Sequence, residues 1–184
     1  MELIALLELL RSNYLLEFES VYRNQLEVNE EVHPEIAFKI SGGVYKRLFV
    51  VDFFGKNGAN TNLIEVGTTN AAYGGGQSFE YSSLSIEFGH VSWDDMLFQL
   101  DPMPQDIVGF EPWFDRWIDL EGEYKKEGAF LSHVIHSASI RNNSVGIDFG
   151  TAPRDAFVQL LDLFKANGVE TIRISSDRKY RRLN

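Results

Sequence analysis

Residues 93–123 combine carboxylates with large aromatic side chains. This segment has nine carboxylates against one basic residue, Arg116, and it holds all three tryptophans of the chain. Tryptophan often anchors protein interfaces, and carboxylates steer a basic partner towards such an anchor. The segment therefore predicts a partner-binding surface. Its candidate contact residues are Asp94, Asp95, Asp106, Glu111, Trp113, Asp115, Trp117 and Asp119.

The same segment also fits an ordinary amphipathic helix. A helix starting near Pro112 places Trp113 and Trp117 one turn apart on one face, and Phe114 and Ile118 on a second. We expect one pair to face the core and the other to remain partly exposed among the acids. The alternative is that the tryptophans simply pack inward, as aromatic stripes usually do.

A second set of candidate residues is Asp52, His133 and His136. Asp52 interrupts the apolar run LFVVDFF, and a buried carboxylate tends to have a perturbed pKa. The structural alternative is an aspartate at a strand end or bonded to nearby backbone. His133 and His136 would point to opposite faces of a strand, so they are not expected to share a metal. The chain has no cysteine and no histidine–carboxylate set with helical ligand spacing, so no metal or cofactor is expected.

Two glycine motifs resemble nucleotide-binding sequences but lack the required context. The run Gly74–Gly76 leads into a β-like stretch, whereas a phosphate-binding loop leads into a helix with a lysine. These glycines instead predict a turn with positive φ or a close approach of two backbones. The triplet DFG at 148–150 lacks the other kinase motifs, and we interpret it as the end of a strand.

The charge of the chain is strongly negative and unevenly distributed. The net charge is −10, and residues 173–184 carry five basic side chains against one acidic. The preceding residues therefore carry 12 basic and 26 acidic side chains, a net of −14, which disfavours nucleic acid as a partner. We expect the basic tail to be solvated near the acidic body. No stretch approaches the ~20 apolar residues of a membrane span, and a cytoplasmic protein is expected.

Hydrophobic periodicity predicts the elements of the first half. Leu3, Leu6, Leu7 and Leu10 share one face of an amphipathic helix. The alternation in residues 14–22 predicts a strand, and the polar stretch 23–35 is expected to be mostly loop. Residues 36–54 predict two strands joined at Gly42-Gly43, the second a central strand. Residues 55–62 are expected to be a loop, and 63–66 to start another strand.

The second half gives clearer signals. Residues 131–140 and 145–150 predict a hairpin joined by RNNS, followed by a helix over 153–168 that ends at Gly168 and by a strand over 169–175.

Residues 83–101 also align without a gap with residues 144–162, which are 61 positions further on. In both segments a strand ends at Phe-Gly and a helix is expected to follow, capped by Ser92 in the first and starting near Pro153 in the second. This match predicts a repeated strand-turn-helix unit and two related halves, residues 1–110 and 111–184, within one compact domain of 1–184. The expected fold class is α+β, a mainly antiparallel sheet with helices packed on one side.

These features favour a small acidic interaction protein without catalytic activity. An inhibitor or immunity protein that binds and neutralises a basic protein, such as a nuclease toxin, has this charge profile. The alternative is a small-molecule-binding protein or an enzyme whose polar pocket uses Asp52, His133 or His136.

Overall fold

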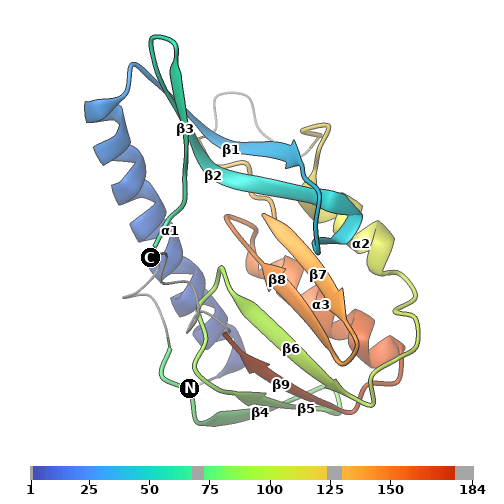
Figure 1. The fold of residues 1–184 in the computed structure, drawn as a ribbon. Coiled ribbons are helices and arrows are strands. Elements are labelled where there is room, and N and C mark those ends of the chain that lie inside the picture. Colours follow the sequence, from blue (N-terminus) through green and yellow to red (C-terminus); the bar gives the residue numbers. More distant parts are fainter. Residues whose placement is uncertain (1, 68–72, 124–129, 177–184) are drawn as a thin grey trace.

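The computed structural model describes residues 2–67, 73–123 and 130–176. In these residues the chain forms three α-helices and two mostly antiparallel sheets (Figure 1), so the predicted α+β class is confirmed. Most of the basic tail lies outside the described residues. No helix in the described part of the chain is both long enough and apolar enough to cross a membrane.

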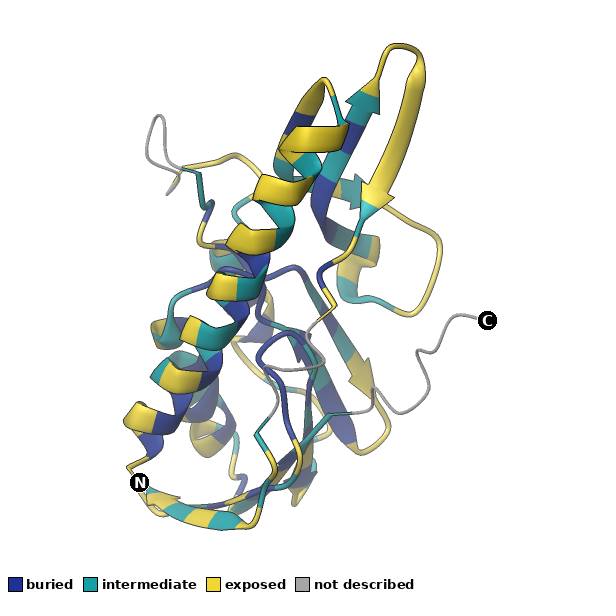
Figure 2. Cartoon of the chain, turned by 90° about the vertical axis from the view of Figure 1, so that its left-hand side faces the viewer, coloured by how far each residue is buried: buried dark blue, intermediate teal, exposed yellow. Residues whose placement is uncertain are grey.

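Helix α1, Leu3–Val28, is a single long helix that lies beside both sheets (Figure 1). Its buried stripe starts at Leu3, Leu6, Leu7 and Leu10, as predicted, and continues through Tyr14 and Phe18. Figure 2 shows this buried stripe on one side of the helix and exposed residues on the other. The predicted strand over 14–22 is wrong, because Tyr14 and Phe18 extend the 3.6-residue period set by the leucines.

The smaller sheet has the strand order β1-β2-β3. Strands β1, Glu31–Lys39, and β2, Leu48–Asn57, pair antiparallel and confirm the hairpin expected across Gly42-Gly43. The loop expected over 23–35 is wrong, since α1 runs to Val28 and β1 begins at Glu31. The loop expected over 55–62 is also wrong, because β2 and β3, Asn60–Ile64, meet at a tight turn where Gly58 has φ +55°.

The larger sheet has six strands in the order β4-β5-β9-β6-β8-β7, and only β5 and β9 run parallel. Its core packs against α2, Phe110–Ile118, and α3, Arg154–Ala166, where Phe98, Phe149 and Phe157 lie in mutual ring contact. The strands are β4 Gln77–Tyr81, β5 Leu84–Phe88, β6 Met96–Asp101, β7 Ser137–Arg141, β8 Ser144–Asp148 and β9 Thr171–Ser175.

The predicted repeat of a strand-turn-helix unit is wrong. Both segments begin as a strand that ends at Phe-Gly, but β6 occupies the place in the first segment that α3 occupies in the second. In β6 the buried residues Met96, Phe98 and Leu100 alternate, which is the period of a strand. Ser92 therefore caps no helix, and its carbonyl instead accepts the N–H of Asp95. Strand β9 lies between β5 and β6, so the larger sheet interleaves strands from both parts of the chain.

The glycine-rich stretch before β4 runs alongside residues 88–91, where Tyr73 pairs with Val91 and the Gly76 N–H donates to the carbonyl of Phe88, so the predicted close approach of two backbones is confirmed and the predicted turn is not. Gly75 and Gly76 have φ of +89° and +87°, and β4 follows directly. A Cβ on Gly75 would lie 2.5 Å from the carbonyl carbon of Gly89, so the two backbones approach closely there. The triplet at 148–150 ends β8, as expected, and the predicted hairpin of β7 and β8, the helix α3 and the strand β9 are all present.

Candidate functional site

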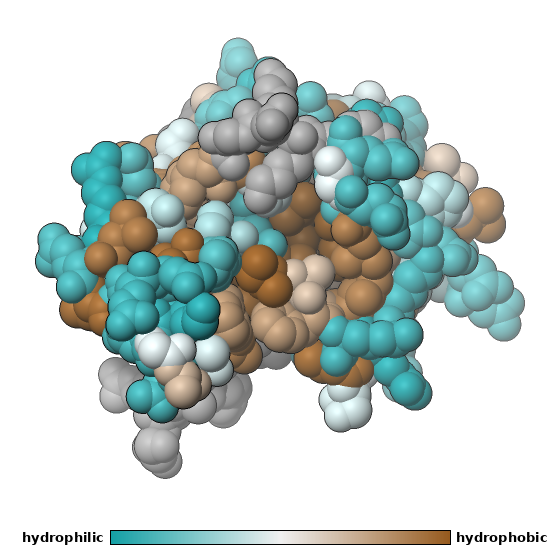
Figure 3. Space-filling view, turned by 90° about the horizontal axis from the view of Figure 1, so that it is seen from above, coloured by the Kyte–Doolittle hydropathy of each residue, from teal (hydrophilic) through white to brown (hydrophobic). Residues whose placement is uncertain are grey.

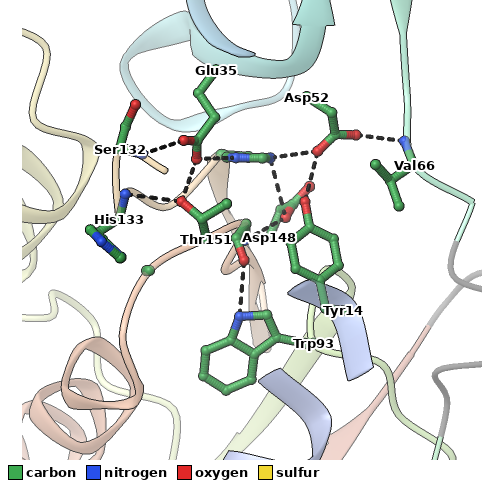
Figure 4. A network of polar contacts seen from close by, with 12 residues as sticks. Tyr14, Glu35, Asp52, Val66, Trp93, Ser132, His133, Asp148 and Thr151 are labelled. Carbon is green, nitrogen blue, oxygen red and sulfur yellow. Dashed lines mark hydrogen bonds and ion pairs between the residues drawn. The ribbon is translucent and has the colours of Figure 1, made fainter. Parts of the chain in front are cut away.

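A buried network of polar side chains centres on His136 and joins the two sheets (Figure 4). His136 precedes β7, and only 2% of its side chain is exposed. Its Nε2 lies 3.1 Å from Oε1 of Glu35 on β1, and its Nδ1 lies 3.1 Å from Oδ1 of Asp52 on β2. Burial alone would lower the pKa of His136, but these carboxylates and the charge of Asp148 raise it well above the ordinary value. The imidazole is therefore protonated and donates to both carboxylates at neutral pH.

Glu35 lies opposite Asp52 across the β1–β2 pair, as the flanking pairs Pro34–Phe53 and Ile36–Val51 show. Its side chain is fully buried. Besides His136, its carboxylate accepts the Ser132 N–H at 2.5 Å and the hydroxyl of Thr151. Burial opposes ionisation of Glu35, but the hydrogen bonds and the positive charge of His136 outweigh it and lower the pKa.

Asp52 connects the network to α1 and to the chain after β3. Its carboxylate accepts the hydroxyl of Tyr14 at 2.7 Å and the backbone N–H of Val66 at 2.7 Å. Burial opposes its ionisation, yet the hydrogen bonds from His136, Val66 and Tyr14 lower its pKa overall. Burial and the nearby Asp52 charge raise the pKa of Tyr14 well above its ordinary value, so Tyr14 remains a proton donor. The bond to Val66 matches the structural alternative for Asp52, a carboxylate held by backbone.

Asp148, at the end of β8, is the carboxylate of the network whose ionised form is stabilised least. Its Oδ1 lies 4.0 Å from Nδ1 of His136 and accepts the N–H of Gly150 at 2.9 Å. Burial, followed by the repulsion of the Asp94 and Asp52 carboxylates, raises the pKa of Asp148 to about 7, although His136 acts in the opposite direction. About 24% of its side chain is exposed, so water relieves part of the repulsion.

The space beside this network is very small. A cavity of about 20 Å³ is lined by Asp52, Asp94, His136 and Asp148, among other residues. Such a volume holds about one water molecule and no substrate. Within the described residues, no group of three or more histidine, aspartate and glutamate side chains is arranged to hold a metal ion. The network therefore ties elements together and has no space for a reacting molecule.

His133, one of the three candidates for a polar pocket, lies apart from the network that holds Asp52 and His136. Residues 131–136 precede β7 and are not a strand, so the predicted strand position of both histidines is wrong. His133 has φ +62°, its N–H donates to Thr151 Oγ1 at 3.0 Å, and its side chain is exposed. It borders an open groove of about 630 Å³ along α1 whose other lining residues are Ser12, Leu15, Leu16, Glu19, Phe130 and Leu131.

The tryptophans of the acidic segment pack mostly inward. Trp93 and Trp113 are buried, and their indole N–H groups donate to the carbonyls of Gly150 and Ala156, both at 3.0 Å. Trp117 is half-buried and donates to Gln159 Oε1 at 3.2 Å. The alternative of an inward-packing helix thus describes Trp113 on α2. Trp93 is buried outside any helix, and Trp117 is the one that retains some exposure.

The eight candidate contact residues do not form one continuous surface. Asp94 is buried beside the His136 network, while Asp95 and Asp119 are half-buried. Asp119 ends α2 with φ +44°, and its carboxylate accepts the N–H of Glu123 at 2.8 Å. The exposed members are Asp106, Glu111 and Asp115.

Lys46, in the β1–β2 connection, lies against α2. Its Nζ is 2.7 Å from a carboxylate oxygen of Glu111 and 2.7 Å from one of Asp115. These two acids lie one turn apart and remain 62% and 52% exposed. One lysine thus compensates two carboxylates that still face solvent.

The most exposed large apolar side chain lies in the loop just before α2. Val108 is 76% exposed, the highest fraction among the large apolar residues described. Asn167, after α3, fixes the backbone of Val108 on both sides: its Oδ1 accepts the Val108 N–H at 2.8 Å, and its Nδ2 donates to the Val108 carbonyl at 3.0 Å. We call Asp106, Val108, Glu111 and Asp115 the Val108 surface.

Figure 3 shows a different face, seen from above over the smaller sheet. Apolar side chains fill the middle of this face, and hydrophilic side chains surround them.

Sequence reasoning missed Glu35, Tyr14, Thr151, Asp148 and Val108. Glu35 fell in an expected loop, and Tyr14 in an expected strand. Val108 follows Ile107 just before α2, and nothing local in the sequence predicts the hydrogen bonds of Val108 with Asn167.

Comparison with known proteins gives no relative, since no family model, no curated protein and no solved structure matches the chain.

Proposed function

We propose that this protein is an acidic interaction protein without catalytic activity, and that it binds a basic protein through the Val108 surface. The partner class that this surface suits best is a basic toxin such as a nuclease, so that the protein acts as an inhibitor of the immunity type. The observation that carries the proposal is the exposed, immobilised Val108 beside Asp106 and Glu111.

An apolar side chain with a fixed backbone suits the centre of an interface. Val108 is held through both its N–H and its carbonyl, so binding would cost little further ordering of this loop. Gly109 next to it has φ +91°, and a Cβ there would lie 2.8 Å from Leu163 Cδ1, which shows how closely the loop packs on α3. A loop that is already ordered before binding loses less conformational entropy when a partner covers it.

The charge around Val108 suits a basic partner. Residues 93–123 have a net charge of −8, and Arg116, their one basic residue, lies 5.2 Å from the centre of the Trp117 ring. Opposite charges on two surfaces speed their encounter and disfavour wrong partners. A nuclease carries a basic surface where it holds nucleic acid, and that surface is complementary to these carboxylates.

The alternative of a polar pocket that uses Asp52, His133 or His136 has less support. Asp52 and His136 are saturated with hydrogen bonds beside a cavity of about 20 Å³, and His133 lies on a separate groove. A general acid or base must reach its substrate directly or through one water. The buried pair has no such access.

Affinity capture with matched variants tests the proposal. The bait is the purified chain, and the test variant carries Asp106→Lys, Val108→Asp and Glu111→Lys. The control variant carries Glu27→Lys, Asn24→Asp and Glu80→Lys, which make the same charge changes at exposed positions away from α2. Asp119 is left unchanged because its carboxylate accepts the N–H of Glu123 in the chain after α2.

We expect the wild type and the control to retain the same basic protein and the test variant to lose it. With that partner purified, stopped-flow association should slow about tenfold or more for the test variant and should slow with salt for the wild type, because steering is screened beyond ~8 Å at physiological ionic strength. Circular dichroism and thermal melting must show that both variants fold. Equal association rates for the wild type and the test variant at low salt would place the interface elsewhere.

A further inference from the structure

His136 is bonded to both sheets by its backbone and by its side chain. Its carbonyl accepts the N–H of Val50 on β2 at 2.8 Å, and its N–H donates to the carbonyl of Asp148 on β8 at 2.9 Å. Its ring bonds to Glu35 and Asp52, both on the smaller sheet. His136 thus joins the two sheets, and its charge state depends on the carboxylates of Asp52, Glu35 and Asp148.

The groups that face His136 are neutral donors and carboxylates, together with one guanidinium. Tyr14 on α1 and Thr151 after β8 are neutral donors to Asp52 and Glu35. Glu65, after β3, lies at the exposed rim of the small cavity. The guanidinium of Arg11 on α1 binds the carbonyls of Thr151 and Ala152. The carboxylates nearest the imidazole are Glu35, Asp52 and Asp148, and Asp94 lines the small cavity that Asp148 also lines.

This count leaves an excess of negative charge when every group is ionised. Three carboxylates would then surround one imidazolium, a net of −2 in a largely buried site. His136 donates to Glu35 and Asp52 at 3.1 Å, but its Nδ1 lies 4.0 Å from the nearest carboxylate oxygen of Asp148. Among the described residues, the close donor to Asp148 is the Gly150 N–H. Like charges held this close cannot all remain ionised without cost. Asp148 is therefore the group that takes up a proton.

The surroundings leave the ring little freedom to adjust. A Cβ on Gly150 would lie 2.2 Å from Cδ2 of His136, so the backbone of residue 150 lies flat against the imidazole. The same residue donates its N–H to Asp148 and its carbonyl accepts the indole N–H of Trp93. The imidazole therefore cannot move away when the charge of Asp148 changes. The change in charge instead alters the stability of the contact between the two sheets.

We propose that Asp148 and His136 form a proton-operated latch between the two sheets, in which uptake of one proton at Asp148 strengthens the contact and its release weakens it. The latch is independent of the proposed partner binding, because Val108 and its neighbours are not part of the network.

The direction of the pH dependence follows from the pKa values. The pKa of Asp148 is raised from 3.8 to about 7, so the folded chain binds this proton more tightly than the unfolded chain, and its stabilisation declines as pH rises through about 7. His136, whose pKa is also raised, adds stability that is complete below about 6.5 and is lost above its raised pKa. Glu35 and Asp52, whose pKa values are lowered, add stability that is lost as pH falls below about 4. The folded state is therefore most stable in mildly acidic solution.

Urea unfolding of the full chain between pH 5 and pH 8 tests the latch, followed by tryptophan fluorescence. With the pKa values above, Asp148 alone should contribute about a 100-fold rise in the unfolding equilibrium constant of the wild type over this range, in addition to the rise that His136 contributes above pH 6.5. In Asp148→Asn, which keeps the size and cannot ionise, the rise should be about 100-fold smaller than in the wild type, and the part due to His136 should remain. Asp106→Asn removes an exposed carboxylate and should keep the wild-type rise, which controls for general charge repulsion. A rise in Asp148→Asn equal to that of the wild type would overturn the proposal.

A second measurement does not depend on any variant. Carbon-13 NMR of the aspartate side-chain carboxyls should show one group, assigned to Asp148, that titrates between pH 6 and pH 8. Amide exchange of Val50 and His136, measured as protection factors corrected for the intrinsic pH effect, should become faster over the same range. A carboxyl of Asp148 that titrates below pH 5 would refute the latch directly.

Discussion

Replacement of His136 by asparagine should destabilise the fold more than any other single change to a histidine in this chain. Among the residues that the structure describes, the imidazole is the one cation in contact with Glu35 and Asp52, and both hydrogen bonds measure 3.1 Å. Asparagine has a similar polarity but no charge, and it is too short to reach both carboxylates. Glu35 keeps the donors Ser132 and Thr151, so the loss is partial.

The expected loss of stability follows from the burial of His136 with Glu35 and Asp52. Removal of one partner from a buried ion pair costs about 3–5 kcal/mol, because the remaining charge has no compensation. We expect a loss of about 4 kcal/mol at pH 7 for His136→Asn, which is a large part of the ~5–15 kcal/mol that stabilises a typical domain. At pH 5 the loss should shrink, since Glu35 and Asp52 then take up protons more readily without the imidazolium.

The assay is equilibrium unfolding in urea, read by tryptophan fluorescence, with His133→Asn as the matched control. His133 lies in the same stretch of chain, but its side chain is exposed, and asparagine tolerates its φ of +62°. The control should change the free energy of unfolding by about 0.5 kcal/mol or less. A loss below about 1 kcal/mol for His136→Asn, or an equal loss for both variants, would refute the reasoning about a buried ion pair.

Three further predictions concern backbone and metal. Gly150→Ala should cost about 3 kcal/mol or more and lower the melting temperature, because its Cβ would meet the ring of His136 at 2.2 Å. Gly75→Ala should cost about 2 kcal/mol, since its Cβ would lie 2.5 Å from the backbone of Gly89, whereas Gly74→Ala meets nothing within 4 Å and should be nearly neutral in the same melting assay. Dialysis against a chelator should leave the melting temperature unchanged, and a stoichiometric metal whose removal lowers it would show this expectation to be wrong.

The elements that sequence predicted correctly are those with a local and regular pattern. The leucines of α1, the stripe of Phe157, Leu160, Leu161 and Phe164 in α3, and the hairpin of β7 and β8 each specify their own structure. The errors arose where two periods competed. In α1 the alternation from Leu16 suggested a strand, but Tyr14 and Phe18 follow the helical stripe and decide the outcome.

The buried network could be predicted only in part. The position of Asp52 in an apolar strand signalled a buried carboxylate, and it proved to be one. Its partners carry no local signal, because Glu35 and His136 are 101 residues apart and Thr151 and Glu35 are 116 apart. Only the packing of the two sheets brings these residues together. For the same reason the contact between Val108 and Asn167, 59 residues apart, was not visible in the sequence.

The most direct test of the proposed function is site-specific photo-crosslinking at Val108. A benzophenone amino acid at position 108 places the reactive group where the side chain is already 76% exposed, and the same residue at Leu16 on α1, 66% exposed, gives the matched control. The proposal predicts that the chain labelled at 108 crosslinks one basic protein, that the chain labelled at 16 does not, and that Asp106→Lys with Glu111→Lys abolishes the product. Both labelled chains must still bind that protein. If the chain labelled at 16 then crosslinked it and the chain labelled at 108 did not, the result would contradict the proposed surface.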